Sequence, residues 1–253
     1  MSLMTRRPVQ LLARSARFSR ACALGVALPI LTALLPVTLA GSQPAQASEL
    51  WVALPAPALD IPKTSSPLQS AVLSGGCFWG TQGVFEHVQG VRQVLAGYAG
   101  GEKATADYES VSTGRTGHAE SIQISFDPAI VSYGEILRIF FSVAHDPTEV
   151  NQQGPDEGTQ YRSEIFYADA NQQRIAQAYI AQLDQAHLLG RPIATRVDPL
   201  KGFYAAESYH QDYLYHNPHS LYIMANDLPK ITKLQRLFPQ EYSDKPALLP
   251  NAR

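Results

Sequence analysis

The sequence predicts an α+β domain in which helices pack on a mixed sheet in a split βαβ arrangement. The apolar patterns follow one another as strand, helix, strand, strand, helix, strand. About 170 residues lie between two proline-containing stretches without a further linker or a repeat, as expected of one domain. The 253 residues are 45% hydrophobic, enough for one sizeable core. We therefore expect a single domain over residues 68–240.

Glycines separate the elements in the first half of this domain. Gly75 and Gly76 follow a short apolar strand, Gly90 follows a helical pattern, and Gly100 and Gly101 end the next strand. A later stretch alternates apolar with polar residues, which is the period of a half-buried strand. The expected elements are strands at 71–73, 91–98 and 122–126 and helices at 78–87 and 133–144.

The second half continues the alternation of strands and helices. The longest helical pattern ends before Gly190 and Pro192, two residues that commonly stop a helix. The expected elements are strands at 161–167 and 194–197, a helix at 171–189, and helical pieces near 205–215 and 228–238.

The ends of the chain differ from the domain in composition. Residues 1–47 hold five arginines and no acidic residue, with an uncharged run at 21–41, which indicates an export signal. The run is long enough to span a bilayer, so the signal is either cleaved or kept as a membrane anchor. Residues 48–67 read as a proline-rich linker, and residues 241–253 as a tail. We expect an exported protein of the periplasm, the thylakoid lumen or the extracellular space.

The charge balance excludes one class of partner. Five of the 20 basic residues lie in the predicted signal, which leaves 15 against 22 acidic residues in the rest of the chain. Binding to phosphate backbones depends on clustered lysine and arginine. We therefore expect no nucleic acid partner.

Cysteine usage limits the redox chemistry. The chain has two cysteines, and Cys22 lies in the predicted signal. Cleavage would leave Cys77 as the one thiol, without a partner for an internal disulfide. A lone cysteine in an exported protein indicates a reactive thiol or pairing with another molecule, unless it is buried and inert.

Cys77 lies between the first strand and the first helix. A thiol at a helix N-terminus faces free backbone N–H groups and the positive end of the helix dipole, so we expect a lowered pKa. Phe78 and Trp79 follow it and offer aromatic surface for an apolar group. The alternative is that both are ordinary core residues.

Glu120 opens the strand that ends at Phe126. Burial at this position would raise the pKa of its carboxyl group, which could then act as a general acid. The alternative is a surface carboxylate at a strand end. The preceding His118 completes an H-x-E pattern typical of zinc deaminases, but the two further cysteines of that site are missing. We expect no metal, because the other histidines lack ligand spacing.

A third cluster covers residues 156–163. It contains Asp156 and Tyr161, and Tyr108 lies upstream of it. The two phenols are candidate hydrogen-bond donors to a bound oxygen.

Six short strings together resemble the peptide methionine sulfoxide reductase A family. They occur in the family's order and extend over about residues 71–214, nearly the whole predicted domain. The strings are Gly-Cys-Phe-Trp-Gly at 76–80, Gly-Tyr-Ala-Gly-Gly at 97–101, Thr-Gly-His-Ala-Glu at 116–120, His-Asp-Pro at 145–147, Gly-Thr-Gln-Tyr-Arg-Ser at 158–163 and Tyr-His-Gln at 209–211.

The resemblance implies a ferredoxin-like α+β fold, reduction of the S epimer of methionine sulfoxide, and a role for each candidate residue. Cys77 corresponds to the nucleophile and Glu120 to the acid that protonates the sulfoxide oxygen. The other implied roles are hydrogen bonding to that oxygen by Tyr108 and Tyr161, a methyl pocket of Phe78 and Trp79, and contact of Asp156 with the substrate backbone.

One departure from the family concerns recycling. Many relatives carry resolving cysteines near the C-terminus, and this tail has none. The expected cycle therefore leaves Cys77 as a sulfenic acid that an external thiol reduces: thioredoxin-like proteins, glutaredoxin or glutathione, or dithiothreitol in vitro. We expect no bound cofactor, and oxidised proteins or free methionine sulfoxide as substrates. Two alternatives stay open, a cysteine hydrolase that pairs Cys77 with a distant histidine and a non-catalytic binding module.

Overall fold

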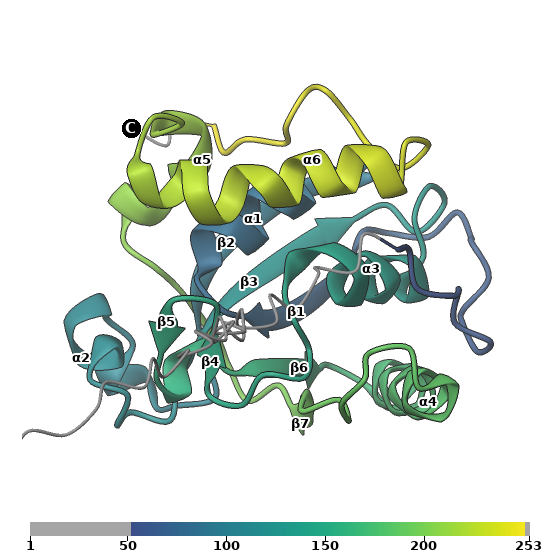
Figure 1. The fold of residues 1–253 in the computed structure, drawn as a ribbon, viewed down its shortest axis with the longest axis horizontal. Helices are drawn as coiled ribbons and strands as arrows, with labels where there is room; N and C mark the ends of the chain where they lie inside the picture. Colours follow the sequence, from purple (N-terminus) through teal and green to yellow (C-terminus); the bar gives the residue numbers. More distant parts are fainter. Residues whose placement is uncertain (1–51, 251–253) are drawn as a thin grey trace, which may run out of the picture. The chain divides into compact units, whose positions relative to one another are not determined.

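The computed structural model describes residues 52–250, which form a curled mixed sheet with helices packed on it (Figure 1). The strand order is β7-β6-β1-β3-β2-β8, and neighbouring strands are antiparallel except for β6 and β7, which are parallel. The strands are β1 (Gln69–Gly75), β2 (Val91–Ala99), β3 (Ala119–Phe126), β6 (Ser163–Tyr167), β7 (Arg196–Pro199) and β8 (Phe203–Ala205).

The arrangement of β1, β2 and β3 is the predicted split βαβ unit. Helix α1 (Phe78–Glu86) connects β1 to β2, and β3 lies between these two strands. Helix α3 (Tyr133–Ile139) then leads toward β6 on the other side of β1. The predicted α+β fold with a mixed sheet in a single domain is confirmed.

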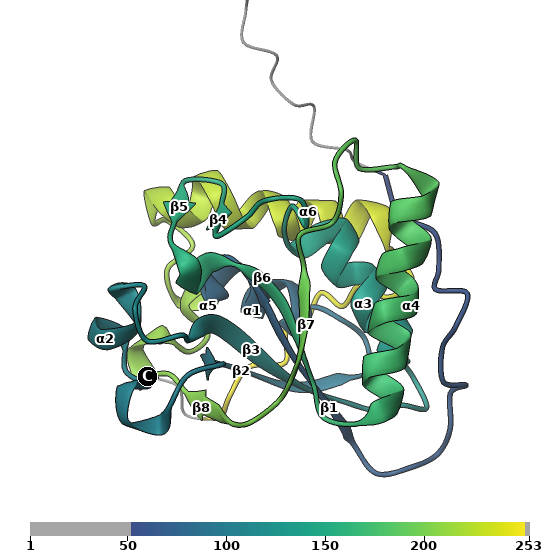
Figure 2. The same ribbon diagram turned by 90° about the horizontal axis from the view of Figure 1, so that it is seen from below.

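The helices cover one face of the sheet. Figure 1 shows α1, α3 and α6 (Leu228–Leu237) on the same side, and Figure 2 shows α4 (Ala170–Ala186) alongside β7. All four helices contribute to one apolar core, which also holds Ile122 and Ile124 of β3. The opposite face carries a small cluster formed by Val72, Ala99, Ala119 and Phe166.

Local sequence signals explain where α3 begins. The Ser132 side chain accepts a hydrogen bond from the backbone of Glu135, and the Glu135 side chain accepts one from the backbone of Ser132, which is a capping box. The predicted helix 133–144 is present, but its last turn, Phe140–Ala144, has the wider π form.

Short elements were missing from the sequence prediction. The stretch 205–215, expected to be helical, holds the end of β8, a 3-10 turn and the beginning of a short helix. Such pieces span too few residues to show a period. They are α2 (Tyr108–Ser112), α5 (Tyr213–His216), strands β4 (Gln152–Gln153) and β5 (Asp156–Glu157), 3-10 turns Lys103–Thr105, Thr159–Tyr161 and Ser208–His210, and the π turn Ile223–Asp227.

The N-terminal part of the described chain is extended and docked on the helices. Leu54 is buried in the core; its backbone N–H donates to Ser142 Oγ at 3.1 Å, and its carbonyl accepts from Arg138 Nε at 2.7 Å. Tyr179 of α4 donates to the carbonyl of Pro55 at 2.7 Å. The prolines therefore do not prevent this segment from packing against α3 and α4.

The predicted export signal lies outside the described residues, as do Cys22 and the apolar run at 21–41. Among residues 52–250, no helix is both long and apolar enough to cross a membrane. At the other end, the chain after α6 runs back along α1, where Ser243 and Ala247 donate backbone hydrogen bonds to the carbonyls of His87 and Glu86.

Candidate active site

Cys77 occupies the turn between β1 and α1 and is the N-cap residue of α1. The residue is 8% exposed, so the thiol is nearly buried rather than on the surface. Gly76 precedes it with φ +84, a conformation that favours glycine, and a Cβ there would lie 2.5 Å from Gln153 Cγ. The glycine therefore lets the β4–β5 hairpin close over the turn that carries the thiol.

Glu120 reaches the same turn from β3. It lies on the strand face that holds Ile122, Ile124 and Phe126, which places it toward α1. The backbone N–H of Phe78 donates to Glu120 Oε2 at 3.0 Å. Because Phe78 directly follows Cys77, this bond holds the carboxyl group beside the thiol.

Burial raises the pKa of Glu120 to about 8, opposed by the hydrogen bond from Phe78 and supported by the charge of Asp156. The side chain is 3% exposed. The predicted direction of the shift is confirmed, and the surface alternative is wrong. Glu120 is therefore protonated at neutral pH and can donate a proton.

The predicted lowering of the thiol pKa is wrong for this structure. Burial raises the pKa of Cys77 well above its usual value, and the charges of Glu120 and Asp227 add to the increase. The N–H of Trp79 and the charge of Lys230 act in the opposite direction and are weaker. The helix N-terminus does favour the thiolate, as argued from sequence, but the desolvation of a nearly buried sulfur outweighs it.

Phe78 and Trp79 differ in their surroundings. Phe78 is 1% exposed and packs against Tyr98 and His210, with ring centroids at 5.8 and 5.0 Å. Trp79 is partly exposed, and its ring stacks on Tyr213 at 3.8 Å with an interplanar angle of 12°. Trp79 therefore offers the more accessible aromatic surface, whereas Phe78 belongs to the core beneath it.

The orientation of the Trp79 ring is fixed by two further contacts. Its Nε1–H donates to His210 Nδ1 at 3.1 Å, and Tyr222 meets it edge-on at 5.9 Å. The hydroxyl of Tyr222 in turn donates to Asp156 Oδ2. Asp156 is thus connected to the aromatic cluster through Tyr222.

Tyr108 and Tyr161 approach from two different segments, α2 and the turn before β6. Burial raises the pKa of both phenols, and the charge of Glu120 is the second cause in each case. The ring of Tyr108 packs on His210 at 4.5 Å. Both phenols therefore remain protonated donors in the electrostatic neighbourhood of Glu120 and Cys77.

Four residues around the site were not predicted from the sequence. Tyr222, Asp227 and Lys230 come from the C-terminal segment that covers α1, and nothing in their spacing indicated this contact. The fourth is His210, for which the sequence predicted no role in the site, although it stands in the Tyr-His-Gln string at 209–211 that carries the family resemblance. That string was the available signal.

The remaining motif histidines serve structural contacts. His118 accepts from the backbone N–H of Gly101 at 3.2 Å and contacts the carbonyl of Glu102 at 3.0 Å, which holds the turn after β2. His145 is buried, with Nδ1 on the carbonyl of Phe140 and Nε2 on Ser163 Oγ. Across residues 52–250, no three His, Cys, Asp or Glu side chains are grouped so that they could hold a metal ion.

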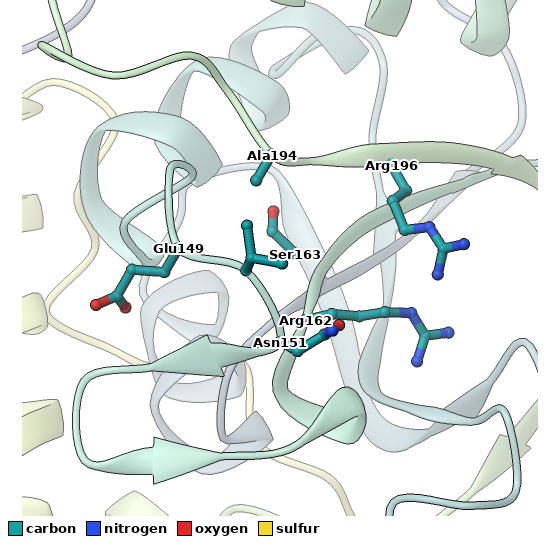
Figure 3. Close-up of a pocket in the computed structure, with 7 residues that line it drawn as sticks. Glu149, Asn151, Arg162, Ser163, Ala194 and Arg196 are labelled. Carbon is teal, nitrogen blue, oxygen red and sulfur yellow. The ribbon is translucent and has the colours of Figure 1, made fainter.

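A separate hollow with a volume of about 350 Å³ lies beside β6 (Figure 3). Cys77 and Glu120 are not among the residues that line it. Its polar lining has no thiol or aromatic ring, so it offers none of the chemistry described above. The lining residues are Glu149, Val150, Asn151, Arg162, Ser163, Ala194 and Arg196.

Comparisons of sequence agree with this geometry. A family model described as peptide methionine sulfoxide reductase matches residues 69–242. Peptide methionine sulfoxide reductase MsrA 2 of Mesorhizobium japonicum is 55% identical over 190 residues, which cover 75% of this chain and 97% of that protein. The protein of the same name from Synechocystis sp. is 52% identical over 195 residues, 76% of this chain and 89% of that protein.

Comparisons of structure lead to the same family. The reduced form of Mxr1 from Saccharomyces cerevisiae aligns with a TM-score of 0.54 at 34% identity, over 64% of this chain and 94% of that chain. Methionine sulfoxide reductase A of Corynebacterium diphtheriae aligns with a TM-score of 0.53 at 34% identity, over 67% of this chain and 85% of that chain. The resemblance seen in the sequence is confirmed: the chain belongs to the peptide methionine sulfoxide reductase family.

Proposed function

We propose that this protein repairs oxidised proteins by reducing methionine S-sulfoxide, with Cys77 as nucleophile and Glu120 as general acid. The observation that carries the proposal is the hydrogen bond from Phe78 to Glu120, because it fixes a protonated carboxyl group beside the one thiol of the site. A sulfoxide oxygen leaves readily only once it is protonated, and Glu120 can supply that proton.

In the first half of the cycle, the thiolate of Cys77 attacks the sulfoxide sulfur while Glu120 protonates the oxygen. The S–O bond of the sulfoxide and the newly formed S–S bond then break, the oxygen ends on Cys77 with the proton from Glu120, and methionine leaves with the electron pair of the S–S bond on its sulfur. Cys77 is thereby oxidised to a sulfenic acid and the substrate is reduced by two electrons. Tyr108 and Tyr161 donate hydrogen bonds to the oxygen, Phe78 and Trp79 bury the methyl group, and Asp156 contacts the substrate backbone.

In the second half, an external thiol attacks the sulfenic acid, water leaves, and a mixed disulfide forms. A second external thiol then releases Cys77 by exchange. An external route is required by the proposal because the sequence has two cysteines and Cys22 belongs to the predicted signal. Thioredoxin-like proteins, glutaredoxin and glutathione are the reductants to compare.

The hydrolase alternative needs an imidazole that is free to activate Cys77. Both ring nitrogens of His145 are already in contact with Phe140 and Ser163. Nδ1 of His210 accepts from Trp79, which puts the ring proton on Nε2, and Nε2 has no hydrogen-bond partner among the described residues. These contacts favour the reductase over the hydrolase.

The deciding experiment supplies a peptide containing methionine sulfoxide as separate S and R epimers, first without and then with dithiothreitol. Without reductant, we expect one methionine per protein from the S epimer, one added oxygen on Cys77 by mass spectrometry, and then arrest. Dithiothreitol should restore turnover. Cys77→Ser should abolish both the single release of methionine without reductant and the turnover with dithiothreitol. Equal use of the epimers, or a covalent dimer through Cys77 formed as fast as methionine, contradicts the proposal.

Export completes the proposal. The arginine-bearing leader and the apolar run at 21–41 indicate delivery to the periplasm, the thylakoid lumen or the extracellular space. Fractionation combined with N-terminal sequencing of the mature protein distinguishes cleavage near residue 47 from a retained membrane anchor. Recovery of the intact chain in the cytosol contradicts export.

A further inference from the structure

The C-terminal segment places an ion pair, formed by a buried aspartate and a partly exposed lysine, against the first turn of α1. Asp227 is 0% exposed, and its Oδ1 accepts from Lys230 Nζ at 3.1 Å. A Cβ at Gly80 would lie 2.0 Å from Asp227 Oδ1 and 2.8 Å from Lys230 Nζ. Only a glycine lets the pair come this close, and Gly80 is three residues after Cys77 (Figure 1 shows α6 alongside α1).

The pair costs stability unless something compensates it. Asp227 Oδ2 is buried and has no hydrogen-bond partner among the described residues. Removing a carboxylate from water is expensive, and a single bond to Lys230 returns part of that cost. A glycine that admits such a pair at Gly80, three residues after the nucleophile in the first turn of α1, points to an electrostatic role.

We propose that Asp227 and Lys230 are positioning residues that set the proton affinity of Cys77, with Lys230 favouring the thiolate and Asp227 favouring the thiol. Both charges act on the thiol in these opposite directions. The other titratable groups that interact with Cys77 are Glu120 on β3 and the phenols of Tyr108, Tyr161 and Tyr222. Among these groups Lys230 is the cation, so it counteracts two carboxyl groups.

The inference deepens the proposed reductase function and bears on its last step. In that step an external thiolate attacks the external sulfur of the mixed disulfide, the S–S bond breaks, and its electron pair stays on Cys77. A thiol of lower pKa leaves faster. Lys230 therefore assists release of the enzyme, which matters in a chain whose proposed cycle relies on external thiols alone.

The test is the pH dependence of Cys77 alkylation by iodoacetamide in the full chain, followed by mass spectrometry of the Cys77 peptide. Lys230→Met should move the midpoint up by roughly one pH unit and Asp227→Asn should move it down by a similar amount. The double variant should return close to the wild type, and so should Lys230→Arg, which keeps the charge. Lys201→Met, an exposed lysine, controls for net charge.

Shifts of opposite sign cannot arise from a merely structural role, which would move both variants in the same direction or in neither. The inference is overturned if the midpoint of alkylation shifts in the same direction in both variants, or in neither. If Asp227→Asn does not fold, the two Lys230 variants suffice. Lys230→Met removes the positive charge and should raise the midpoint of the alkylation profile, whereas Lys230→Arg keeps the charge and should leave the midpoint unchanged. Alkylation is independent of sulfoxide reduction, so opposite shifts in a protein that reduces no sulfoxide would reject the proposed function and leave this inference standing.

Discussion

Helix α1 has a buried carboxyl group at each end, and the two ends give those groups different chemistry. At the N-terminal end, Glu120 accepts a hydrogen bond from Phe78, which opposes the effect of burial on its pKa. At the C-terminal end, burial raises the pKa of Glu86 and the charge of Asp212 raises it further. Free N–H groups at a helix N-terminus stabilise negative charge, whereas the carbonyls at the other end do not.

The comparison teaches that burial alone does not produce a catalytic acid. Glu86 is 2% exposed and its Oε1 has no hydrogen-bond partner within the described part of the chain. Its pKa is raised by burial and by Asp212, at the opposite end of α1 from the thiol. Glu120 is as deeply buried, but a backbone N–H stabilises its ionised form, so it can release a proton and regain it. The two carboxyl groups are distinguished by the end of α1 that each one faces, more than by how deeply each is buried.

Matched Glu→Gln substitutions give the largest expected difference between the ends. Glu120→Gln keeps the shape and a hydrogen-bond donor but cannot release a proton, so sulfenic acid formation should slow by roughly a hundredfold or more. Glu86→Gln should change that rate by less than about twofold, because Glu86 does not contact the site. Single-turnover kinetics without reductant measures both. An equal loss of this rate in the two variants would contradict a special role of Glu120 in the reaction.

The pH dependence of the same step should be tenfold per pH unit at its steepest. The reacting form combines protonated Glu120 with the Cys77 thiolate, and its population grows with pH until Glu120 ionises at a pKa of about 8. The rate should therefore rise up to about pH 8 and level off above it. In Glu120→Gln the levelling at pH 8 should disappear. A rate that falls steadily from pH 6 contradicts this assignment.

Trp79→Ala tests the partly exposed aromatic surface at the N-terminal end of α1. Loss of the ring should slow sulfoxide reduction by roughly tenfold or more, since an apolar pocket discriminates by burying the methyl group. Reaction of Cys77 with a small alkylating agent should stay nearly unchanged. If both reactions slow in parallel, Trp79 supports the position of the thiol and does not form a pocket.

The smallest expected effect concerns stability. A carboxyl group whose pKa is raised in the folded state keeps its proton there after the unfolded chain has lost it, above about pH 4.3. The free energy of unfolding therefore falls as pH rises, by up to about 1.4 kcal/mol per pH unit for each such group. Glu86→Gln should flatten this slope in urea unfolding between pH 4.5 and 7, and Glu120→Gln should do so to a similar extent. An unchanged slope for Glu86→Gln would mean that its pKa is ordinary.

The sequence predicted the half of the site that is local. Cys77 and Phe78 are neighbours, and Glu120 opens a strand with a clear alternating pattern, so their elements could be inferred from period and turn residues. The pattern left Glu120 either buried or on the surface at the strand end, and the structure shows that it is buried. The residues themselves offered Tyr108 and Tyr161 as candidate donors to a bound oxygen, and the resemblance identified that oxygen as the sulfoxide oxygen.

The other half of the site depends on long-range packing. Lys230 and Asp227 reach α1 from about 150 positions along the chain, and no local pattern encodes that contact. The thiol pKa was mispredicted for the same reason, because desolvation by distant segments outweighed the local helix effect. Short elements such as β8 were missed because three residues cannot establish a period.

The docked segment around Leu54 has a consequence for where a self-sufficient enzyme begins. The match to the family model starts at residue 69, yet Leu54 fills part of the core and Asp60 accepts hydrogen bonds from Ser132 and Gly134 at the start of α3. A protein trimmed to the matched residues would expose the apolar surface that Leu54 covers and would leave Arg138 without its carbonyl partner. Leu54 and Asp60 therefore belong to the folded domain, although both precede the residues that the family model matches.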